Sequence, residues 1–342
     1  MVGRLAPPAQ SVHAVEGAAR LVIRGAVFFN RDGVLQRDLT VLALRACAAD
    51  AAARGEPPLH VLDAMAGGGV RALRYALEVE GIGLVVANDA DELAVRCIRE
   101  SAALSGCDDP SRLRIERTDA CELMLARPAH FAAICLDPFG SCAHLLPAAV
   151  RALRSGGVLF ASCTDLETLS GLHAGACAQR YNVRPLPHAP CARELALRTL
   201  LASVSAAAGA LGRTATPLLS VAVDFFVRVI VRVDDARGAG GALDAAVGSG
   251  RAGDGRADDG ARGGRLGDGV APLLVRVCAG CGTHATQRLG AHASAGFAIG
   301  GAAACSVCGT PGAGGDLRVS AWGGPYWGCL LYTSDAADDS LR

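Results

Sequence analysis

The sequence predicts an α/β protein with a mostly parallel sheet. From residue 59 onward, short apolar runs alternate with helical patterns, which is typical of parallel strands joined by crossover helices. Two adjacent β-rich runs, 218–224 and 225–233, follow and predict an antiparallel hairpin at the end of the sheet. Several apolar runs end in an acidic residue, which places carboxylates at the edge where α/β sheets bind ligands.

The individual elements follow from periodicity and from the glycines and polar residues that flank each run. A pair of glycines, Gly156 and Gly157, marks the stop of the third helix, and the buried run that follows completes another β-α-β step. The strands expected before the hairpin are 59–63, 84–89, 113–118, 131–137 and 158–164. The expected helices are 70–80, 91–104, 138–154 and 192–210.

At 342 residues the chain exceeds what one hydrophobic core usually holds, so we expect a large α/β unit and a smaller second unit. A stretch dominated by Gly, Ala, Asp and Arg separates them and should be disordered. The last residues resemble a translated sequencing adapter, so we exclude them and expect the natural C-terminus to be missing. The segments are 1–58 (N-terminal segment), 59–233 (α/β domain), 234–270 (disordered insertion), 271–328 (small unit) and 329–342 (scar).

Composition excludes several classes of protein. Hydrophobic residues make up 51% of the chain, enough for a sizeable core, but no run approaches the ~20 apolar residues that a membrane span needs. The 33 basic residues balance the 33 acidic ones, so net charge gives no sign of a polyanionic partner. Most of the 14 cysteines stand singly in apolar runs, as Cys135 and Cys163 do, which favours a reducing intracellular compartment.

Three strand ends predict a cofactor site. Asp63 ends a strand and precedes a glycine loop in which Gly67 and Gly69 let the backbone approach a ligand. Asp89 ends the next strand, where its carboxylate could accept hydrogen bonds from two ribose hydroxyls, and Asp119-Ala120 follows the third, near an adenine amino group. This order favours an adenosine cofactor. The loop alone could be a tight turn, and it lacks the G-x-G-x-x-G pattern of nicotinamide oxidoreductases.

The sharpest catalytic candidate is Asp137-Pro138-Phe139-Gly140-Ser141, which follows a fully apolar strand. Its carboxylate should lie at the sheet edge beside the cofactor cleft. Pro138 would fix the direction of its own carbonyl, and Phe139 offers a face for stacking. The competing interpretation is that Asp-Pro merely ends the strand and starts a turn.

Two Cys-x-x-Cys-Gly sequences predict a structural zinc site in the small unit. Four thiolates suit tetrahedral zinc, and each glycine admits the tight turn at its Cys pair. With no open coordination position, the ion would stabilise a unit too small and glycine-rich to fold alone. The expected ligands are Cys278, Cys281, Cys305 and Cys308.

Together these stretches resemble the tRNA guanine-N2 dimethyltransferase family, over roughly residues 15–328. The resemblance is carried by VFFNRDGVLQRDLTV, DAMAGGGVRALRYALE, ANDADELAV, LDPFGS, SCTDLETLSG, PLLSVAVDFFVRVIVRV, the two Cys pairs and GGPYWG. It implies a Rossmann-like class I methyltransferase domain over 59–233 with a reversed C-terminal hairpin. It also implies a small, truncated zinc-binding C-terminal domain that helps to grip tRNA.

The resemblance implies S-adenosyl-L-methionine as methyl donor and guanine 26 of tRNA as acceptor. Arg37 and Asp38 match a family pair beside the cofactor, Arg71 matches an arginine near it, and Asp137 matches the catalytic carboxylate. The chain departs from the family pattern at Gln36, where Asn is usual, and at Gly67-Gly68, where a small hydroxyl residue is usual. We expect a monomer without membrane attachment, in the nucleus, or alternatively in a mitochondrion or plastid.

The chemistry fits the acceptor that the resemblance implies. The guanine amine is a poor nucleophile because its lone pair is delocalised, so Asp137 and the Pro138 carbonyl would orient its hydrogens. Phe139 would stack on the extruded base. Arg24, Arg193, Arg198 and Arg213 are candidates for phosphate contacts on sequence position alone, and a solvated arginine face explains them equally well.

Two alternatives stay open. One is methylation of another planar amine, such as DNA adenine or protein glutamine, because an acid or amide followed by Pro and an aromatic residue serves all of these acceptors. The other is a noncatalytic zinc-containing RNA-binding protein that has kept the fold. Calorimetry of cofactor binding would separate the second alternative from an enzyme.

Overall fold

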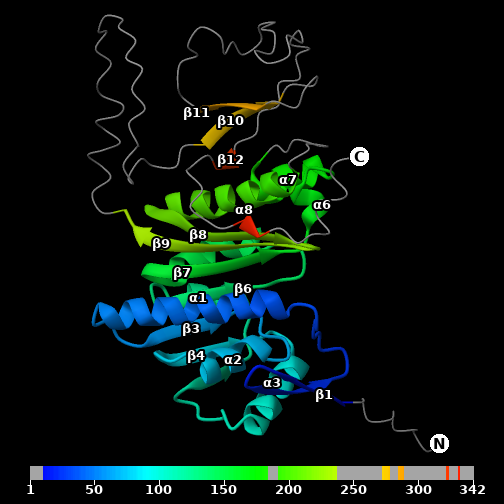
Figure 1. Cartoon of the computed structure of the whole chain (residues 1–342), viewed down its shortest axis with the longest axis vertical. Helices are drawn as coiled ribbons and strands as arrows, with labels where there is room; N and C mark the ends of the chain where they lie inside the picture. The colour runs from blue at the N-terminus through cyan, green and yellow to red at the C-terminus, as the bar shows by residue number, and fades with distance from the viewer. Residues whose placement is uncertain are drawn as a thin grey trace, which may run out of the picture.

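The computed structural model describes residues 11–183 and 192–236, together with the backbones of four short strands at 272–277, 284–288, 321–322 and 330–331. Its centre is an eight-stranded sheet in the order β13-β8-β9-β7-β6-β3-β4-β5 (Figure 1). The strands of this sheet are β3 (Leu59–Asp63), β4 (Ile82–Asn88), β5 (Leu113–Glu116), β6 (Phe131–Leu136), β7 (Leu153–Cys163), β8 (Arg213–Val223), β9 (Phe226–Asp235) and β13 (Leu330–Leu331).

Strands β3 to β7 pair in parallel with one another, and β9 pairs antiparallel with both β7 and β8. The mostly parallel α/β sheet and its reversed terminal hairpin are therefore confirmed. The order also places β3 and β6 side by side, so their carboxyl ends, at Asp63 and Asp137, meet at one edge.

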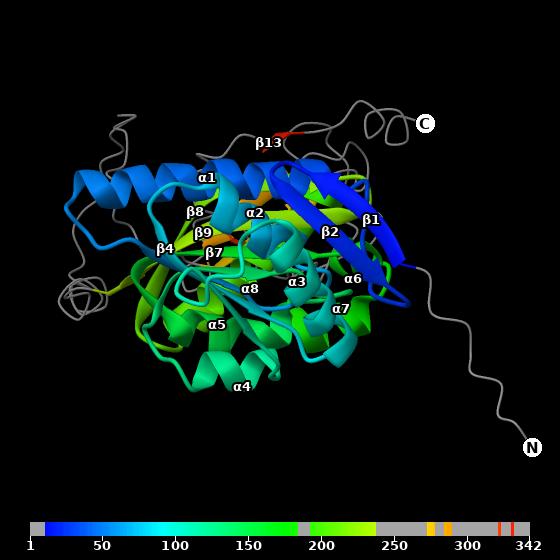
Figure 2. The same ribbon diagram turned by 90° about the horizontal axis from the view of Figure 1, so that it is seen from below.

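Helices cover both faces of the sheet, as alternate residues of each strand require. On one face α1 (Val34–Ala53), α2 (Val70–Glu78) and α3 (Glu92–Leu104) bury Val61 and Phe160 of the sheet. On the other face α4 (Ala120–Leu125), α5 (Leu146–Ala152) and α8 (Ala192–Gly209) bury Leu62 and Val229. Figure 2 shows α1 on the opposite side of the sheet from α4 and α5. The remaining helices are η1 (Ala143–Leu145), α6 (Leu166–Leu169) and α7 (Ala174–Tyr181).

The N-terminal segment forms structure that the sequence did not predict. Strands β1 (Ser11–Glu16) and β2 (Ala19–Arg24) make an antiparallel hairpin beside α3, where the Val22 amide donates to Ser101 Oγ at 2.9 Å. Helix α1 then runs along the face of the sheet (Figure 1). Because this segment packs on the α/β domain, it shares that domain's core.

Several expected boundaries differ from the observed ones. Strand β8, for example, begins at Arg213 instead of residue 218. The helix expected over 138–154 is shorter, since a loop precedes η1 and β7 already starts at Leu153. Strand β9 continues to Asp235, two residues into the expected disordered insertion, because Asp234 and Asp235 pair with the start of β8. Strand β13 lies within the expected scar and pairs with β8. Residues 237–270 of the expected disordered insertion lie outside the described residues.

A second sheet joins β10 (Pro272–Val277), β11 (His284–Arg288) and β12 (Ala321–Trp322) in antiparallel pairs. The four predicted zinc ligands lie outside the described residues. In the part of the chain that the structure describes, no helix has the length and apolar character to cross a membrane. The eight cysteines described there are free thiols, including buried Cys135 and Cys163.

Candidate active site

Asp137 lies at the carboxyl end of β6, inside a set of polar side chains from four elements. Arg71, from the start of α2, forms an ion pair with Asp137 Oδ2. Gln36, from α1, donates from Nε2 to Asp137 Oδ1 at 2.9 Å and to Ser162 Oγ, on β7, at 2.6 Å. The side-chain oxygen of Gln36, Oε1, accepts from Arg71 Nη2 at 3.0 Å. The structure thus brings Arg71 and Asp137 together, as the predicted site requires.

The surroundings of Asp137 lower its pKa. Burial acts to raise the pKa, but Arg71, Arg228 and the hydrogen bonds from Gln36 and Ser162 outweigh it. The carboxylate is therefore ionised at neutral pH, and a fifth of its side-chain surface is exposed. It is an anionic acceptor that faces an open edge.

Asp63 lies deeper at the same edge and has no hydrogen-bond partner of normal geometry for either carboxylate oxygen. It is 1% exposed. Burial raises its pKa to about 6, against the opposing effect of Arg71 and with smaller upward contributions from Asp137 and Asp89. Arg71 Nε is likewise buried without an acceptor. Buried polar atoms without partners are rare and need an explanation, which a bound ligand would supply.

The glycine loop after β3 is tied to the end of β4. Gly67 has a φ of +54°, and its amide donates to Asp89 Oδ2 at 2.8 Å. The Asp91 amide donates to Asp89 Oδ1 at 2.9 Å, so each oxygen keeps a lone pair. Gly69, with a φ of +86°, caps α2, and a Cβ there would press on the Ile98 side chain at 3.1 Å. The loop and Asp89 form one unit.

Asn88 is a structural residue of this edge that the sequence analysis missed. Its side-chain amide donates to the carbonyls of Ala64 and Thr118, and its Oδ1 accepts from the Thr118 amide at 3.0 Å. It therefore joins the loops that follow β3 and β5. Its position at the end of a strand just before Asp89 was the available signal.

Asp119 is exposed and caps α4, since its Oδ1 accepts from the amides of Cys121 and Glu122 at 2.8 and 3.1 Å. Strand β5 ends three residues earlier, at Glu116, and Ala120 is buried at the helix start. The capping role explains Asp119 without a ligand. Both of these bonds use Oδ1, and contact of Asp119 with an adenine amino group stays a prediction.

Two exposed aromatic rings meet at the loop that follows Asp137. Phe139 is 78% exposed and Phe28 is 59% exposed, and their centroids lie 5.0 Å apart in an edge-to-face arrangement. The loop that carries Phe139 is fixed by Thr164, whose Oγ accepts from the Gly140 amide and whose amide donates to the Gly140 carbonyl, both at 2.8 Å. Phe28 and Thr164 were not predicted.

Arg37 and Asp38 lie in a different cluster from Asp137. Arg37 is 3% exposed and forms a two-bond ion pair with Glu16 of β1, and Asp38 pairs with Arg74 of α2 at 2.7 Å. Arg74 also pairs with Glu16 at 2.9 Å. These contacts fasten the N-terminal hairpin to α1 and α2. The cofactor contact that the resemblance implies for Arg37 and Asp38 stays a prediction.

The four arginines suggested for phosphate contacts lie on three elements, β2, α8 and β8, and three of them have intramolecular partners. Arg24 pairs with Glu100 at 2.8 Å, and Arg198 pairs with Glu194 at 2.6 Å. Arg213 pairs with Asp235, and its Nη1 also donates to the carbonyls of Val150 on α5 and Leu153 at the start of β7. Arg193 Nη1 is buried without a partner among the described residues. The geometry gives Arg24, Arg198 and Arg213 roles within the fold.

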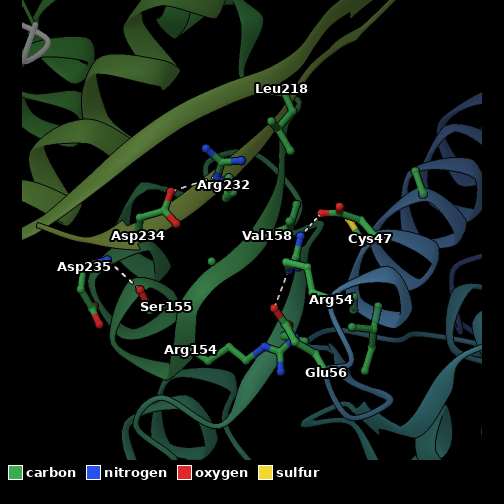
Figure 3. A pocket seen from close by; sticks show the side chains of 16 residues that line it. Cys47, Arg54, Glu56, Arg154, Ser155, Val158, Leu218, Arg232, Asp234 and Asp235 are labelled. Atoms are coloured by element: carbon green, nitrogen blue, oxygen red, sulfur yellow. Dashed lines mark hydrogen bonds and ion pairs between the residues drawn. The ribbon is translucent and has the colours of Figure 1, made fainter. Parts of the chain in front are cut away.

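A hollow of about 700 Å³ lies at the opposite edge of the sheet, near the amino ends of β3 and β7 (Figure 3). Its charged walls are mutually paired. Arg54 and Arg154 both bond Glu56, at 2.6 and 2.9 Å, and Arg232 bonds Asp234 at 2.9 Å. Such paired charges fit a solvated surface, and the candidate site remains the carboxyl edge.

Comparisons with known proteins support one family. A model of the N2,N2-dimethylguanosine tRNA methyltransferase family matches residues 9–246. The chain is 41% identical over 184 residues to tRNA (guanine(26)-N(2))-dimethyltransferase 1 of Arabidopsis thaliana, covering 54% of this chain and 31% of that protein. It is 37% identical over 259 residues to tRNA (guanine(26)-N(2))-dimethyltransferase of Homo sapiens, covering 75% and 35%. The chain thus spans about a third of the length of these relatives.

Among solved structures, Trm1 from Pyrococcus horikoshii, in complex with S-adenosyl-L-methionine, superposes with a TM-score of 0.70. The alignment covers 92% of this chain and 74% of that one at 23% identity, so it supports the Rossmann-like methyltransferase fold. The family match covers most of the described α/β domain and the hairpin before it. The chain belongs to the N2,N2-dimethylguanosine tRNA methyltransferase family.

Proposed function

We propose that this protein dimethylates the N2 amine of guanine 26 in tRNA, with S-adenosyl-L-methionine as methyl donor. The observation that carries the proposal is the ionised Asp137 carboxylate at the carboxyl edge of the sheet, where Arg71 and Asp63 have unpaired buried atoms and the loop after Asp137 carries the exposed Phe139 ring. A carboxylate and an aromatic face together suit a planar amine. The unpaired atoms suit a ligand that brings both a donor and an acceptor.

The residues present fit the proposed cofactor. The two unpaired oxygens of Asp63 would accept from its ammonium group, and Arg71 would attract its carboxylate. Asp89 keeps lone pairs for ribose hydroxyls, and the positive φ at Gly67 and Gly69 lets the backbone approach without strain. When bound, S-adenosyl-L-methionine supplies an electrophilic methyl group on its sulfonium.

The substrate side is formed by Phe28, Phe139 and Asp137. An extruded guanine would stack on the exposed rings, a contact that contributes about 1–3 kcal/mol per base. The Asp137 carboxylate and the Pro138 carbonyl would accept from the two amine hydrogens and so hold the nitrogen lone pair in line for attack. The lowered pKa of Asp137 guarantees that the acceptor is charged at neutral pH.

Asp137 also offers a place for the proton that the amine must lose. An alkylated exocyclic amine that still carries both hydrogens is cationic and strongly acidic, so even a carboxylate with a lowered pKa can accept its proton. The free lone pairs of Asp137 would hold this proton before it leaves to solvent. A second methylation requires only that the remaining hydrogen point at the same acceptor.

We also propose that Cys278, Cys281, Cys305 and Cys308 bind one structural zinc ion in a unit that helps to hold tRNA. In the sequence the first pair falls between β10 and β11, which pair antiparallel from Leu273 with Arg288 to Val277 with His284. Four thiolates from two Cys-x-x-Cys-Gly sequences suit zinc. We further propose an intracellular monomer, in the nucleus, a mitochondrion or a plastid.

Methylation of unmodified tRNA by the full-length protein tests the proposed function. We expect mass spectrometry of digested tRNA to show N2-methyl- and then N2,N2-dimethylguanosine, and Asp137→Ala to abolish both. Asp108→Asn, on an exposed loop, is the matched control and should retain activity. Absence of both products with the unsubstituted protein would refute the proposal, and methyladenosine in the same digest would favour a different planar amine.

A further inference from the structure

A buried arginine on β9 has no carboxylate in direct contact among the residues that the structure describes. Arg228 is 1% exposed and lies on a strand whose other central residues are apolar. Its guanidinium donates to Ser162 Oγ and to Thr40 Oγ at 2.8 Å, and it lies 5.7 Å from the centre of the Phe160 ring. Its Nε has no partner. Burying a charge without a bonded counterion costs several kcal/mol, so its presence calls for an explanation.

Ser162 connects this charge to the catalytic candidate. Its hydroxyl oxygen accepts from Arg228 Nη1 and from Gln36 Nε2, which occupies both lone pairs. The hydroxyl proton is then free for Asp137, whose ionised form it stabilises. Because two donors polarise the Ser162 oxygen, the hydroxyl becomes a stronger donor to the carboxylate.

Gln36 completes the arrangement by bonding Asp137, Ser162 and Arg71 at once, at 2.9, 2.6 and 3.0 Å. We propose that Gln36, Ser162 and Arg228 position the Asp137 carboxylate, keeping it ionised and leaving its outward lone pairs for the guanine amine. This inference rests on the proposed function. The three are positioning residues, since each acts through Asp137.

Charge effects on Asp137 agree with this role. After Arg71, Arg228 is the largest contributor that lowers the pKa of Asp137. The charged or titratable groups around these residues are Arg71 and Tyr75 from α2, Asp63 from β3, Asp89 after β4, Cys135 from β6 and Arg228 from β9. The negative charges of Asp63 and Asp137 repel each other, which disfavours ionisation of both. Arg228, as a second cation beside Arg71, therefore favours the charged form of Asp137.

The competing explanation is that Arg228 merely fastens β9 to α1 and β7, because Thr40 and Ser162 belong to those elements. A fastener would affect stability alone. A positioning residue would change the titration of Asp137 and the turnover number, while cofactor affinity and the KM for tRNA stay nearly constant. The first explanation therefore predicts a change in stability alone, and the second predicts changes in the titration of Asp137 and in the turnover number.

The test uses Ser162→Ala and Arg228→Met in the full-length protein, with Arg228→Lys as the conservative variant. Arg232→Met is the matched control, because Arg232 lies on the same strand but at the far edge, where it bonds Asp234 (Figure 3). Circular dichroism melting establishes that each variant folds. If Arg228→Met does not fold, Ser162→Ala carries the test, since it removes only one hydroxyl.

Two readouts decide the inference. Carbon-13 NMR of labelled aspartate follows the Asp137 carboxyl, assigned by its loss in Asp137→Asn, and we expect its titration midpoint to rise in Ser162→Ala and Arg228→Met. We expect kcat to fall by about ten- to a hundredfold, as a misplaced reacting group does, with calorimetric affinity for S-adenosyl-L-methionine within about twofold. Arg228→Lys should restore most of the midpoint shift, and Arg232→Met should change neither readout.

A folded Ser162→Ala protein with an unchanged Asp137 midpoint and a kcat within about twofold of the original would overturn the inference. The NMR titration needs no tRNA. An original protein that transfers no methyl group would overturn the proposed function, and the titration would still show whether these residues control Asp137.

Discussion

Helix α2 carries two arginines three residues apart, and each lies in a buried ionic cluster. Arg74 bonds Glu16, Glu78 and Asp38 at 2.7 to 3.0 Å, and Glu16 also bonds Arg37. In that cluster no buried polar atom lacks a partner. Around Arg71, by contrast, Arg71 Nε and both oxygens of Asp63 are unpaired.

The difference distinguishes a structural cluster from a binding site built on the same helix. In the Arg74 cluster the fold itself satisfies every buried charge, so this cluster holds the N-terminal hairpin in place. In the Arg71 cluster the fold leaves buried polar atoms without partners of good geometry, which costs stability and which the proposed ligand would satisfy. Substitutions in the two clusters should therefore have opposite effects on stability.

The largest effect should come from Glu16→Gln in the structural cluster. Glu16 is 8% exposed, and its replacement takes the carboxylate partner from buried Arg37 and one of three carboxylate partners from Arg74. We expect the free energy of unfolding in urea to fall by about 3–5 kcal/mol. Glu100→Gln is the matched control, because Glu100 pairs with Arg24 at the surface and should change stability by less than about 1 kcal/mol. Equal effects of the two substitutions would contradict the distinction.

Asp63→Asn should have the opposite effect, stabilising the ligand-free protein. The pKa of Asp63 rises from 3.8 to about 6 on folding, which corresponds to roughly 3 kcal/mol. Because the folded pKa is the higher one, the stabilising contribution of Asp63 is present below pH 4 and is lost as the pH rises through about 6. The neutral amide avoids that loss, so we expect a gain of about 1–3 kcal/mol at pH 8.

Urea unfolding of both proteins between pH 4 and pH 8 checks this expectation, since the difference should vanish at the acid end. The same substitution should weaken S-adenosyl-L-methionine about ten- to a hundredfold in calorimetry, because a charge-assisted hydrogen bond is lost. A stability difference that does not change with pH would show that Asp63 is not the group that titrates.

Glu78→Gln in the structural cluster should lower the free energy of unfolding. Burial acts to raise the pKa of Glu78, but the hydrogen bond from Arg74 outweighs burial and lowers the pKa.

Much of this architecture could be predicted from sequence because its signals are local. The strand ending in Asp63, the glycine loop and the hairpin of β8 and β9 each follow from a run of apolar residues and its flanking residues. Asp137 was placed at the sheet edge for the same reason. Hydrophobic periodicity and strand termination depend on neighbours in the chain, which a single sequence contains.

The partners of these residues could not be predicted, because they come from distant parts of the chain. Gln36 reaches Asp137 across 101 residues, and Arg228 reaches Thr40 across 188. The hairpin of β1 and β2 was missed because its apolar–polar alternation is short. In addition, two of its charged residues, Glu16 and Arg24, form ion pairs within the fold. Which of two neighbouring arginines, Arg71 or Arg74, serves the site depends on tertiary packing alone.

The smallest effect should come from Asp38→Asn, which tests where the structural cluster ends. Asp38 is 46% exposed at its side chain, and Arg74 keeps Glu16 and Glu78 after the substitution. We expect stability to fall by less than about 1 kcal/mol. Cofactor affinity separates two interpretations, because the family resemblance places Asp38 beside the cofactor whereas its observed contacts belong to the structural cluster. A calorimetric affinity within about twofold would keep Asp38 in the structural cluster, and a loss of about tenfold or more would show that the ligand draws Asp38 away from Arg74.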